Sequence, residues 1–399
     1  MSQCSQIGSY FFGSENWCFQ IQPLYKAGIL TSLSNGEVHL MDWKSNKSIN
    51  KFKSDETAIN ALQIVNTDWH NETRFITASM HAVKLFDVRS NACIGTIHNE
   101  VGAPFLSLDS RYDKIACGTE LKGVDAQLHI FDLRKLDNPW KSLVDSHHDD
   151  ITSIKFHPSD CNVLLSGSTD GYTNIYDLSQ EEEDDSLHQV INFTSIHSCG
   201  WVNPKRIYTL SHMETFAIHE LNNKSDELTE PQPLDFGDIR AAWGCDYVVD
   251  IYPGYVATGK SHEEGKGELK LIPLKGENVV IDNTISIPSA HGDEVIRDVF
   301  IPEQNSEVVY SCGEDGYLNI WRNNSGPLNV PEKFWNYDIP MNVLDESLDS
   351  FAGQPPISLQ SEPSAMDTAL KSETKKHKKK KEKRSKEQKH PKSQRYKPY

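Results

Sequence analysis

The sequence contains no long hydrophobic run. No stretch of its 399 residues approaches the ~18 apolar residues that a membrane-spanning helix needs. The first twenty residues also lack the basic segment and apolar core of a signal peptide. We therefore expect a soluble, unsecreted protein that does not bind membranes.

Cysteine pairs are lacking as well. The eight cysteines are scattered, without a CxxC pair or a histidine at the spacing of a zinc finger. Neither a disulfide framework nor a zinc site is indicated by this pattern. We expect free thiols in a reducing compartment, and we predict no metal and no other cofactor.

The sequence does contain a strong separation of charge. Its formal net charge is −17. Residues 371–399 hold fourteen Lys or Arg against three Glu, a formal charge of +11, so residues 1–370 carry −28. The acidic body is a poor ligand for bare nucleic acid, and its charge indicates either basic protein partners or a role in solubility alone.

A strand pattern recurs along this acidic body. Residues 36–43, 81–89, 126–134, 170–178, 213–221, 267–274 and 315–322 alternate apolar and polar side chains, which is typical of half-buried strands. The first four stretches place Asp42, Asp87, Asp132 and Asp177 at a constant spacing of 45 residues. Such regular spacing indicates a repeated structural unit.

Hairpin signals precede two of these stretches. Asp-Gly at 170–171 and at 315–316 suits a tight turn between strands, because glycine accepts a positive φ without steric cost. Stretches with a helical period are absent. The pattern predicts an all-β fold of seven units, each made of several antiparallel strands that pack radially against their neighbours.

These residues resemble the WD-repeat family, whose blades combine an early His, a Ser-Gly-Ser-x-Asp-Gly hairpin and a terminal Trp-Asp. The resemblance implies a single seven-bladed β-propeller over residues 1–335. It also implies a buried network in which the turn Asp bonds the His, the His bonds the Ser, and the Ser reaches an aromatic ring. The matching residues are His148, Ser166, Asp170 and Tyr176 in the fourth unit, and His291, Ser311, Asp315 and Trp321 in the seventh.

The other five units lack the His and the Asp-Gly turn in full, so the network is predicted only for the fourth and seventh. The order of features after residue 180 is similar to that of one group in the family, WD repeat-containing protein 89 and its fungal relatives. In the family, the start of the chain supplies the outermost strand of the last blade. Residues 9–21 are one candidate for that strand and residues 331–339 another, and either would cover an exposed sheet edge.

Two motifs that suggest chemistry have simpler explanations. Residues 254–261 satisfy the G-x-x-x-x-G-K-[ST] pattern of a phosphate-binding loop, which needs a helix after it. Here the motif coincides with an expected strand, and Gly265 and Gly267 oppose a helix. The pair His147 and His148 could supply metal ligands, but one of them is assigned to the network. We predict that the protein is not an enzyme.

Two units end in Phe-Asp-x-Arg. Asp87 with Arg89, and Asp132 with Arg134, resemble the motif by which WD-repeat substrate receptors dock on the adaptor of cullin-RING ubiquitin ligases. Both copies lack the tryptophan, and such endings also occur in propellers that never meet the ligase. A role as a ligase substrate receptor is therefore the alternative function.

Polar segments interrupt and follow the repeats. Residues 181–185 are expected to form a solvated loop, and residues 336–370 a disordered linker. The Lys-rich tail, residues 371–399, fits an import receptor, whereas nucleic-acid binding by it would be weak and non-specific without interleaved aromatic rings. The predicted nuclear-targeting residues are Lys375, Lys376, Lys378, Lys379, Lys380, Lys381, Lys383 and Arg384.

Together these features predict a monomeric scaffold that binds protein partners through the loops of one face and the central channel of the propeller. We expect it in the nucleus with a cytoplasmic pool, and the nucleolus is one candidate compartment. Ribosome biogenesis and chromatin-linked assembly are the candidate pathways.

Overall fold

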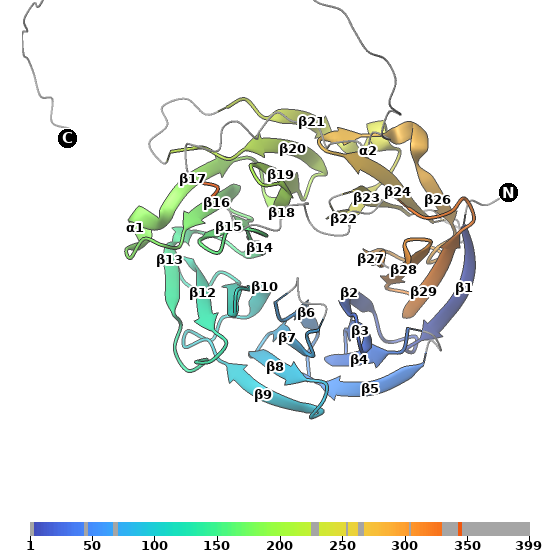
Figure 1. Ribbon diagram of the computed structural model, residues 1–399, viewed down its shortest axis with the longest axis horizontal. Coiled ribbons are helices and arrows are strands. Elements are labelled where there is room, and N and C mark those ends of the chain that lie inside the picture. Colours follow the sequence, from blue (N-terminus) through green and yellow to red (C-terminus); the bar gives the residue numbers. More distant parts are fainter. Residues whose placement is uncertain are drawn as a thin grey trace, which may run out of the picture. The chain divides into compact units, whose positions relative to one another are not determined.

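The computed structural model describes residues 4–43, 47–66, 71–224, 231–252, 254–261, 267–302, 305–328 and 342–344. Residues 4–328 of this set form seven antiparallel sheets arranged in a ring, so the prediction of an all-β, seven-bladed β-propeller is confirmed (Figure 1). We number the blades 1 to 7 in chain order of their innermost strands.

The strands of the blades, each blade from its innermost strand outward, are as follows: blade 1, β2 (Cys18–Leu24), β3 (Gly28–Leu33), β4 (Glu37–Met41) and β5 (Ser48–Lys53); blade 2, β6 (Ile59–Ile64), β7 (Arg74–Ser79), β8 (Val83–Asp87) and β9 (Ala92–Ile97); blade 3, β10 (Phe105–Arg111), β11 (Lys114–Thr119), β12 (Ala126–Asp132) and β13 (Lys141–His147); blade 4, β14 (Ile151–Phe156), β15 (Val163–Ser168), β16 (Tyr172–Asp177) and β17 (Leu187–Asn192); blade 5, β18 (Ile196–Asn203), β19 (Arg206–Ser211), β20 (Thr215–Glu220) and β21 (Leu234–Asp238); blade 6, β22 (Tyr247–Tyr252), β23 (Tyr255–Lys260), β24 (Glu268–Lys275) and two short outer pieces, β25 (Asn278–Val279) and β26 (Ile285–Pro288); blade 7, β27 (Ile296–Phe300), β28 (Val308–Gly313), β29 (Tyr317–Asn323) and β1 (Cys4–Phe11). Short helical segments whose bounds lie within the described residues are α1 (Glu183–Ser186), α2 (Ile239–Trp243) and the 3₁₀ turn η1 (Ile281–Asn283).

The seven alternating stretches seen in the sequence are the third strands of the seven blades. Each third strand is flanked on both sides in its sheet, and the sheets bury both faces against neighbouring blades. An apolar cluster fills each space between two blades; for example, Phe156, Leu164 and Tyr176 of blade 4 pack against Leu128 and Leu143 of blade 3. Burial of this apolar surface is the main force that holds the ring together.

The ring closes between the two ends of the propeller. Strand β1 pairs antiparallel with β29 from Cys4 opposite Asn323 to Phe11 opposite Tyr317, and Figure 1 shows the two strands side by side. Of the predicted closing segment 9–21, only residues 9–11 belong to this strand, and residues 18–21 begin the innermost strand of blade 1. The other candidate, residues 331–339, lies outside the described residues.

Two polar segments are more ordered than the sequence suggested. In the acidic segment 181–185, Glu183 begins the short helix α1, and its carboxylate accepts hydrogen bonds from the N–H groups of Val144 and Asp145, both at 2.9 Å. Residues 181, 182, 184 and 185 are exposed, as expected for a solvated segment. The segment is not a simple loop, however, because residues 183–186 are helical and a neighbouring sheet edge offers unpaired donors to the Glu183 carboxylate.

In the predicted linker, Val343 is fully buried in the apolar cluster between blades 4 and 5, and its N–H donates to Asp160 Oδ2 at 2.8 Å. An apolar Val-Leu pair in an otherwise polar segment thus contacts the propeller, so disorder was the wrong expectation for residues 342–344. The predicted domain boundary at residue 335 and the tail 371–399 lie outside the described residues.

All eight cysteines are free, and six of them are buried. No helix within the described part of the chain is long and apolar enough to cross a membrane.

Candidate protein-interaction site

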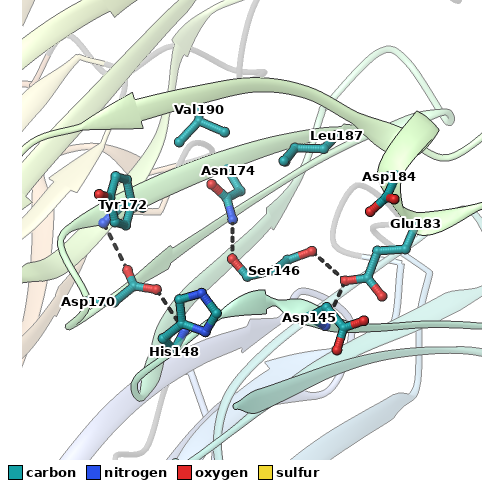
Figure 2. A pocket seen from close by; sticks show the side chains of 10 residues that line it. All are labelled: Asp145, Ser146, His148, Asp170, Tyr172, Asn174, Glu183, Asp184, Leu187 and Val190. Atoms are coloured by element: carbon teal, nitrogen blue, oxygen red, sulfur yellow. Dashed lines mark hydrogen bonds between the residues drawn. The ribbon is translucent and has the colours of Figure 1, made fainter. Parts of the chain in front are cut away.

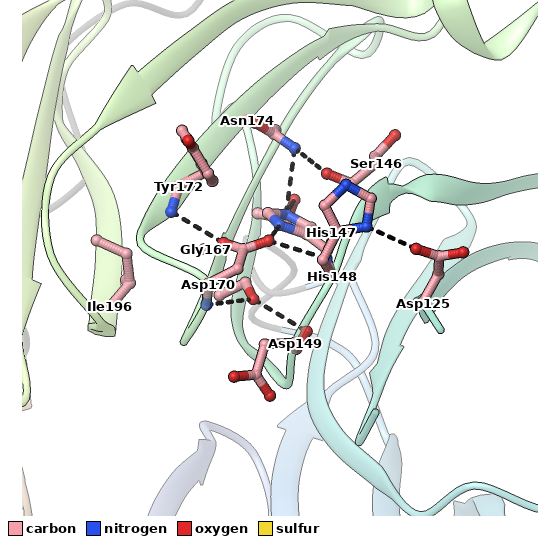
Figure 3. Close-up of polar contacts among 12 residues, drawn as sticks. Asp125, Ser146, His147, His148, Asp149, Gly167, Asp170, Tyr172, Asn174 and Ile196 are labelled. Carbon is pink, nitrogen blue, oxygen red and sulfur yellow. Dashed lines mark hydrogen bonds and ion pairs between the residues drawn. The ribbon is translucent and has the colours of Figure 1, made fainter. Parts of the chain in front are cut away.

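A buried polar network shapes the hairpin of blade 4 (Figure 3). His147 Nδ1 lies 2.9 Å from Asp170 Oδ2, and His147 Nε2 lies 2.8 Å from Ser166 Oγ. Ser166 Oγ in turn lies 3.3 Å from the Tyr176 hydroxyl. The network joins the end of β13 to the turn between β15 and β16, and thereby fixes the loops at that end of the blade.

The histidine in this network is His147, so the prediction of His148 is wrong. Only the backbone N–H of His148 bonds Asp170, at 3.0 Å, while its ring turns outward to Asp125 at 2.6 Å. His147 is the last residue of β13 and its side chain is 1% exposed, against 69% for His148. Spacing could have distinguished them, because His147 precedes Ser166 by 19 residues, close to the 20 between His291 and Ser311.

Blade 7 contains the same arrangement with the predicted residues. His291 Nδ1 lies 2.8 Å from Asp315 Oδ1, and His291 Nε2 lies 2.8 Å from Ser311 Oγ. The Trp321 indole N–H donates to Ser311 Oγ at 2.9 Å. The four side chains lie close together, as the resemblance implied.

Blade 2 contains a related pair that sequence reasoning missed. Asp55 lies four residues before β6, where His147 lies four residues before β14, and His81 occupies the hairpin position of Asp170. His81 Nδ1 contacts Asp55 Oδ1 at 3.0 Å, and Ser79 Oγ donates to the same carboxylate at 2.5 Å. The acid and the imidazole have exchanged places, and a search that required His first and Asp second could not detect them.

Both carboxylates are held in the charged form. Burial by itself would raise the pKa of Asp170, but the hydrogen bond and charge of His147 and two backbone N–H groups outweigh it and lower the pKa. Burial opposes ionisation of Asp55 too, yet hydrogen bonds from Ser79, His81 and backbone N–H groups hold its pKa well below the usual range. These groups therefore act as fixed acceptors and not as acids.

The networks lie at one face of the ring. Because each blade is an antiparallel sheet, the loops between second and third strands share a face with the segments that lead to the next blade. We call this the hairpin face; its described segments are 12–17, 34–36, 54–58, 80–82, 98–104, 120–125, 148–150, 169–171, 193–195, 212–214, 239–246, 289–295 and 314–316.

The hairpin face combines exposed apolar side chains with many acids. Its large exposed hydrophobic residues are Trp17, Met80, Val101, Val124 and Met213, and Phe11 and Tyr172 border it. The acidic residues of its segments are Glu15, Asp55, Glu56, Glu100, Glu120, Asp125, Asp149, Asp150, Asp170, Glu214, Asp246, Asp293, Glu294, Glu314 and Asp315. The same segments contain only two Lys or Arg residues, Lys122 and Arg240.

The innermost strands are joined by side chains that bond the backbone of the next blade. Asp298 Oδ2 accepts the N–H of Ile21 at 2.7 Å, which links blade 7 to blade 1, and Asp109 Oδ2 accepts the N–H of Phe156 at 2.6 Å. Burial raises the pKa of Asp298 to about 8, with a further increase from the charge of Asp250. Burial also raises the pKa of Asp250, and the charge of Lys155 opposes both shifts.

A cleft of about 300 Å³ opens beside the blade 4 network (Figure 2). Its lining comes from β13, the segment between β13 and β14, the β15–β16 turn, β16, α1 and β17: Asp145, Ser146, His148, Asp170, Tyr172, Asn174, Glu183, Asp184, Leu187 and Val190. The position of α1 depends on Glu183, whose carboxylate bonds the edge of β13 and also accepts the hydroxyl of Ser146 at 2.5 Å.

Comparison with known proteins gives the family. The WD domain, G-beta repeat family matches residues 140–177, which span the outermost strand of blade 3 and three strands of blade 4. An uncharacterized WD repeat-containing protein of Saccharomyces cerevisiae is 57% identical over 401 residues, covering 100% of both chains. The chain belongs to the WD-repeat family.

Two more distant WD-repeat relatives agree with the predicted subgroup. An uncharacterized WD repeat-containing protein of Schizosaccharomyces pombe is 31% identical over 339 residues, covering 77% of this chain and 96% of the relative. The WD repeat-containing protein 89 homolog of Dictyostelium discoideum is 29% identical over 311 residues, covering 74% of this chain and 80% of the relative. The predicted similarity to WD repeat-containing protein 89 and its fungal relatives is therefore confirmed.

The Phe-Asp-x-Arg endings of this WD-repeat propeller lie on the face opposite the hairpin face, after β8 and β12. Arg89 donates to Asp87 and Arg134 to Asp132, each with its closest contact at 2.6 Å, and both guanidinium groups are largely exposed. The hydrogen bond from Arg89 lowers the pKa of Asp87, and that from Arg134 lowers the pKa of Asp132. Asp238 and Arg240 make the same contact at α2, so the pairing is a local property of Asp-x-Arg.

The phosphate-loop pattern at 254–261 is a strand in the structure. Residues 255–260 form β23, the second strand of blade 6, paired with β22 and β24 along its length. Its backbone N–H groups are therefore engaged in the sheet and do not form the open cradle that a phosphate needs.

Proposed function

We propose that this WD-repeat protein is a non-enzymatic scaffold that binds protein partners through its hairpin face. The observation that carries the proposal is the combination of exposed Trp17, Met80 and Met213 with a large excess of acids on that face. Aromatic and Met side chains are enriched at protein interfaces. The acids favour partners whose contacting segments are basic.

A matched pair of variants tests which face binds. Trp17 on the hairpin face and Trp140 on the opposite face are exposed to a similar degree, 45% and 50%. Full-length protein with Trp17→Ala and Met213→Ala should recover partners from nuclear extract at least about tenfold less well, because interface Trp residues often contribute 2 kcal/mol or more. The control is Trp140→Ala with Ile94→Ala; Ile94 is exposed on β9, the outermost strand of blade 2, and so lies off the hairpin face. Equal recovery by both variants, or a loss confined to the control, would contradict the proposal.

We further propose that the protein acts in the nucleus, in ribosome biogenesis or chromatin-linked assembly, and that the tail 371–399 directs its import. The support is the lysine-rich composition of the tail, which suits an import receptor and would bind nucleic acid only weakly. Deleting residues 371–399 should move a fluorescent fusion to the cytoplasm. Nuclear retention of the deletion would mean that a partner of the propeller carries it in. Partner recovery that disappears after nuclease treatment would contradict a protein scaffold.

The alternative, a substrate receptor of a cullin-RING ubiquitin ligase, is favoured by Arg89 and Arg134. Their guanidinium groups are held by Asp87 and Asp132 and lie exposed at equivalent positions of adjacent blades. Arg89→Ala with Arg134→Ala should abolish recovery of the ligase adaptor, while Arg240→Ala should leave it unchanged. Adaptor binding that survives in the double variant would end this alternative.

A further inference from the structure

The cleft at the outer edge of blade 4 has an uncompensated negative charge. Asp145, Asp170, Glu183 and Asp184 contribute four carboxylates to its lining. Asp170 is bonded by His147 and the Tyr172 N–H, and Glu183 by the edge of β13. The carboxylates of Asp145 and Asp184 have no hydrogen-bond or ion-pair partner within the described part of the chain.

The cleft contains no compensating cation. His148 is the only lining residue that can carry a positive charge, and its Nδ1 is 2.6 Å from Asp125, outside the lining. The nearby Lys141 donates to the carbonyl oxygens of Gln180 and Glu181, at 2.6 and 3.1 Å. The charge of the cleft is therefore available to a ligand.

A buried acceptor in the same cleft is also unsatisfied. Asn174 is 2% exposed, and its Nδ2 donates to the Ser146 carbonyl at 2.8 Å. Its Oδ1 has no hydrogen-bond partner. Figure 2 shows this oxygen on the side of Tyr172 and Val190, away from Ser146. An unpaired buried acceptor is unfavourable, and a hydrogen-bond donor would satisfy it.

The remaining wall of the cleft is apolar. Tyr172, Leu187 and Val190 line it opposite the acids. Such a wall suits the methylene stem of a long basic side chain, and a tyrosine ring attracts a cation at its face. Negative charge, an acceptor without a donor and an apolar wall thus occur together.

We infer that this cleft binds the arginine or lysine side chain of a basic segment in a protein partner. The ligand's positive charge faces Asp145 and Asp184, and its stem packs on Leu187 and Val190. Asn174 Oδ1 is buried, so a small movement of the side chains around it brings the ligand's N–H groups within reach of this acceptor. Arginine is the better fit, because its planar fork can donate to two acceptors at once. The inference rests on the proposed function, for which it names the chemistry of the partner.

Methyl NMR of the full-length chain, labelled at Leu and Val methyl groups, tests the inference directly. The probes are N-acetyl-arginine amide and its neutral counterpart N-acetyl-citrulline amide. The arginine probe should shift the Leu187 and Val190 resonances in a saturable way and leave unchanged those of Leu234, which is exposed on the outermost strand of blade 5. The citrulline probe should leave the Leu187 and Val190 resonances unchanged, because it lacks the positive charge that the cleft attracts.

A charge-matched pair of variants separates the cleft from the general field of an acidic protein. Asp145→Asn with Asp184→Asn removes the two unpaired carboxylates and should weaken arginine binding about tenfold. Glu182→Gln with Asp185→Asn removes the same charge from neighbouring exposed positions that do not line the cleft, and should have little effect.

Three outcomes would overturn the inference: no saturable shift, equal shifts with citrulline, or equal weakening in both double variants. A water molecule that simply satisfies Asn174 would produce the first of these. Suppose that the Trp17 variant loses its partners, whereas the Asp145→Asn, Asp184→Asn variant stays folded and still recovers them. The proposed function then stands, and only the assignment of the cleft fails. If arginine binds but no partner is recovered, the scaffold proposal fails instead.

Discussion

Blades 2 and 4 build the same corner of the ring from exchanged residues. In blade 4 a buried imidazole, His147, precedes the first strand, and the acid Asp170 lies in the hairpin turn. In blade 2 the acid Asp55 precedes the first strand and the imidazole of His81 lies at the turn. Each pair joins the two equivalent loops of its own blade. The distance from the imidazole Nδ1 to the carboxylate oxygen is 2.9 Å in blade 4 and 3.0 Å in blade 2.

The difference shows what each blade requires at this corner. The required element is a charge-assisted hydrogen bond between two loops, and either residue can occupy either position. The partners differ in exposure, however: the His147 side chain is 1% exposed, whereas that of His81 is 62% exposed. Blade 4 therefore depends on its pair more than blade 2 does, because removing a buried partner leaves the other without water to replace it.

The largest effect is expected for His147→Ala. The change leaves Ser166 Oγ and the Asp170 carboxylate without their partner in a buried site, and should lower the free energy of unfolding by about 3 kcal/mol. Chemical denaturation of the full chain, followed by tryptophan fluorescence, measures it. A loss of stability smaller than that of Asp55→His in blade 2 would show that blade 2 depends more on its pair than blade 4 does.

An exchange in blade 2 tests whether the positions are equivalent. Asp55→His alone places two histidines together and should cost about 2 kcal/mol, since Ser79 and two backbone N–H groups lose their acceptor. Adding His81→Asp restores a pair of the blade 4 type and should recover at least half of that loss. The coupling energy of this double-mutant cycle is the measurement, and strict additivity would show that the two corners are not equivalent.

The inner ring provides a contrast in pH dependence, because its acids are shifted in the opposite direction. The pKa of Asp298 is raised to about 8, so its protonated form is favoured in the folded state. That contribution to stability is complete below the ordinary pKa of about 4 and is lost as pH rises through 8. The thermal midpoint should decrease as pH rises from about 4 to 8 and level off above that, and Asp298→Asn should flatten the profile. An equally steep fall in the variant would assign the effect to another group.

The smallest effect is expected for His148→Ala. Its ring is exposed and pairs only with Asp125, so the free energy of unfolding should change by less than about 0.5 kcal/mol. Comparing the loss of stability in His148→Ala with that in His147→Ala, one residue away, shows whether the effect comes from the buried network or from any change at this site. A loss of stability near 3 kcal/mol would show that His148, and not only His147, belongs to the blade 4 network.

The fold could be predicted because its signal is periodic and local. Alternation located all seven third strands, and the spacing of Asp42, Asp87, Asp132 and Asp177 gave the period. The blade 4 histidine could not be assigned by residue type, since two adjacent histidines both fit the pattern. Only the spacing to the serine separates them: it is 19 residues from His147 to Ser166, against 20 in blade 7. The reversed pair of blade 2 was missed because a motif fixes the order of residue types, whereas a hydrogen bond does not.

The candidate cleft could not be predicted from the sequence. It depends on contacts between segments that are distant along the chain, such as Glu183 with the edge of β13 and Asn174 with Ser146. Read as a sequence, the acids at 181–185 indicate only a solvated loop. The contact of Val343 with Asp160, across 183 residues, was hidden for the same reason.

β1 and β29 pair in the folded protein but are synthesised at very different times. Cys4 lies opposite Asn323, so β1 waits for a partner strand that is made 319 residues later. At about 5–20 residues per second this wait lasts roughly 15–65 s, during which β1 is a free strand with two open edges. Its sequence, CSQIGSYF, contains no charged residue and no proline, so its composition does not prevent pairing with another chain during this interval. Pairing with β29 ends the interval, because it covers one of the two edges of β1.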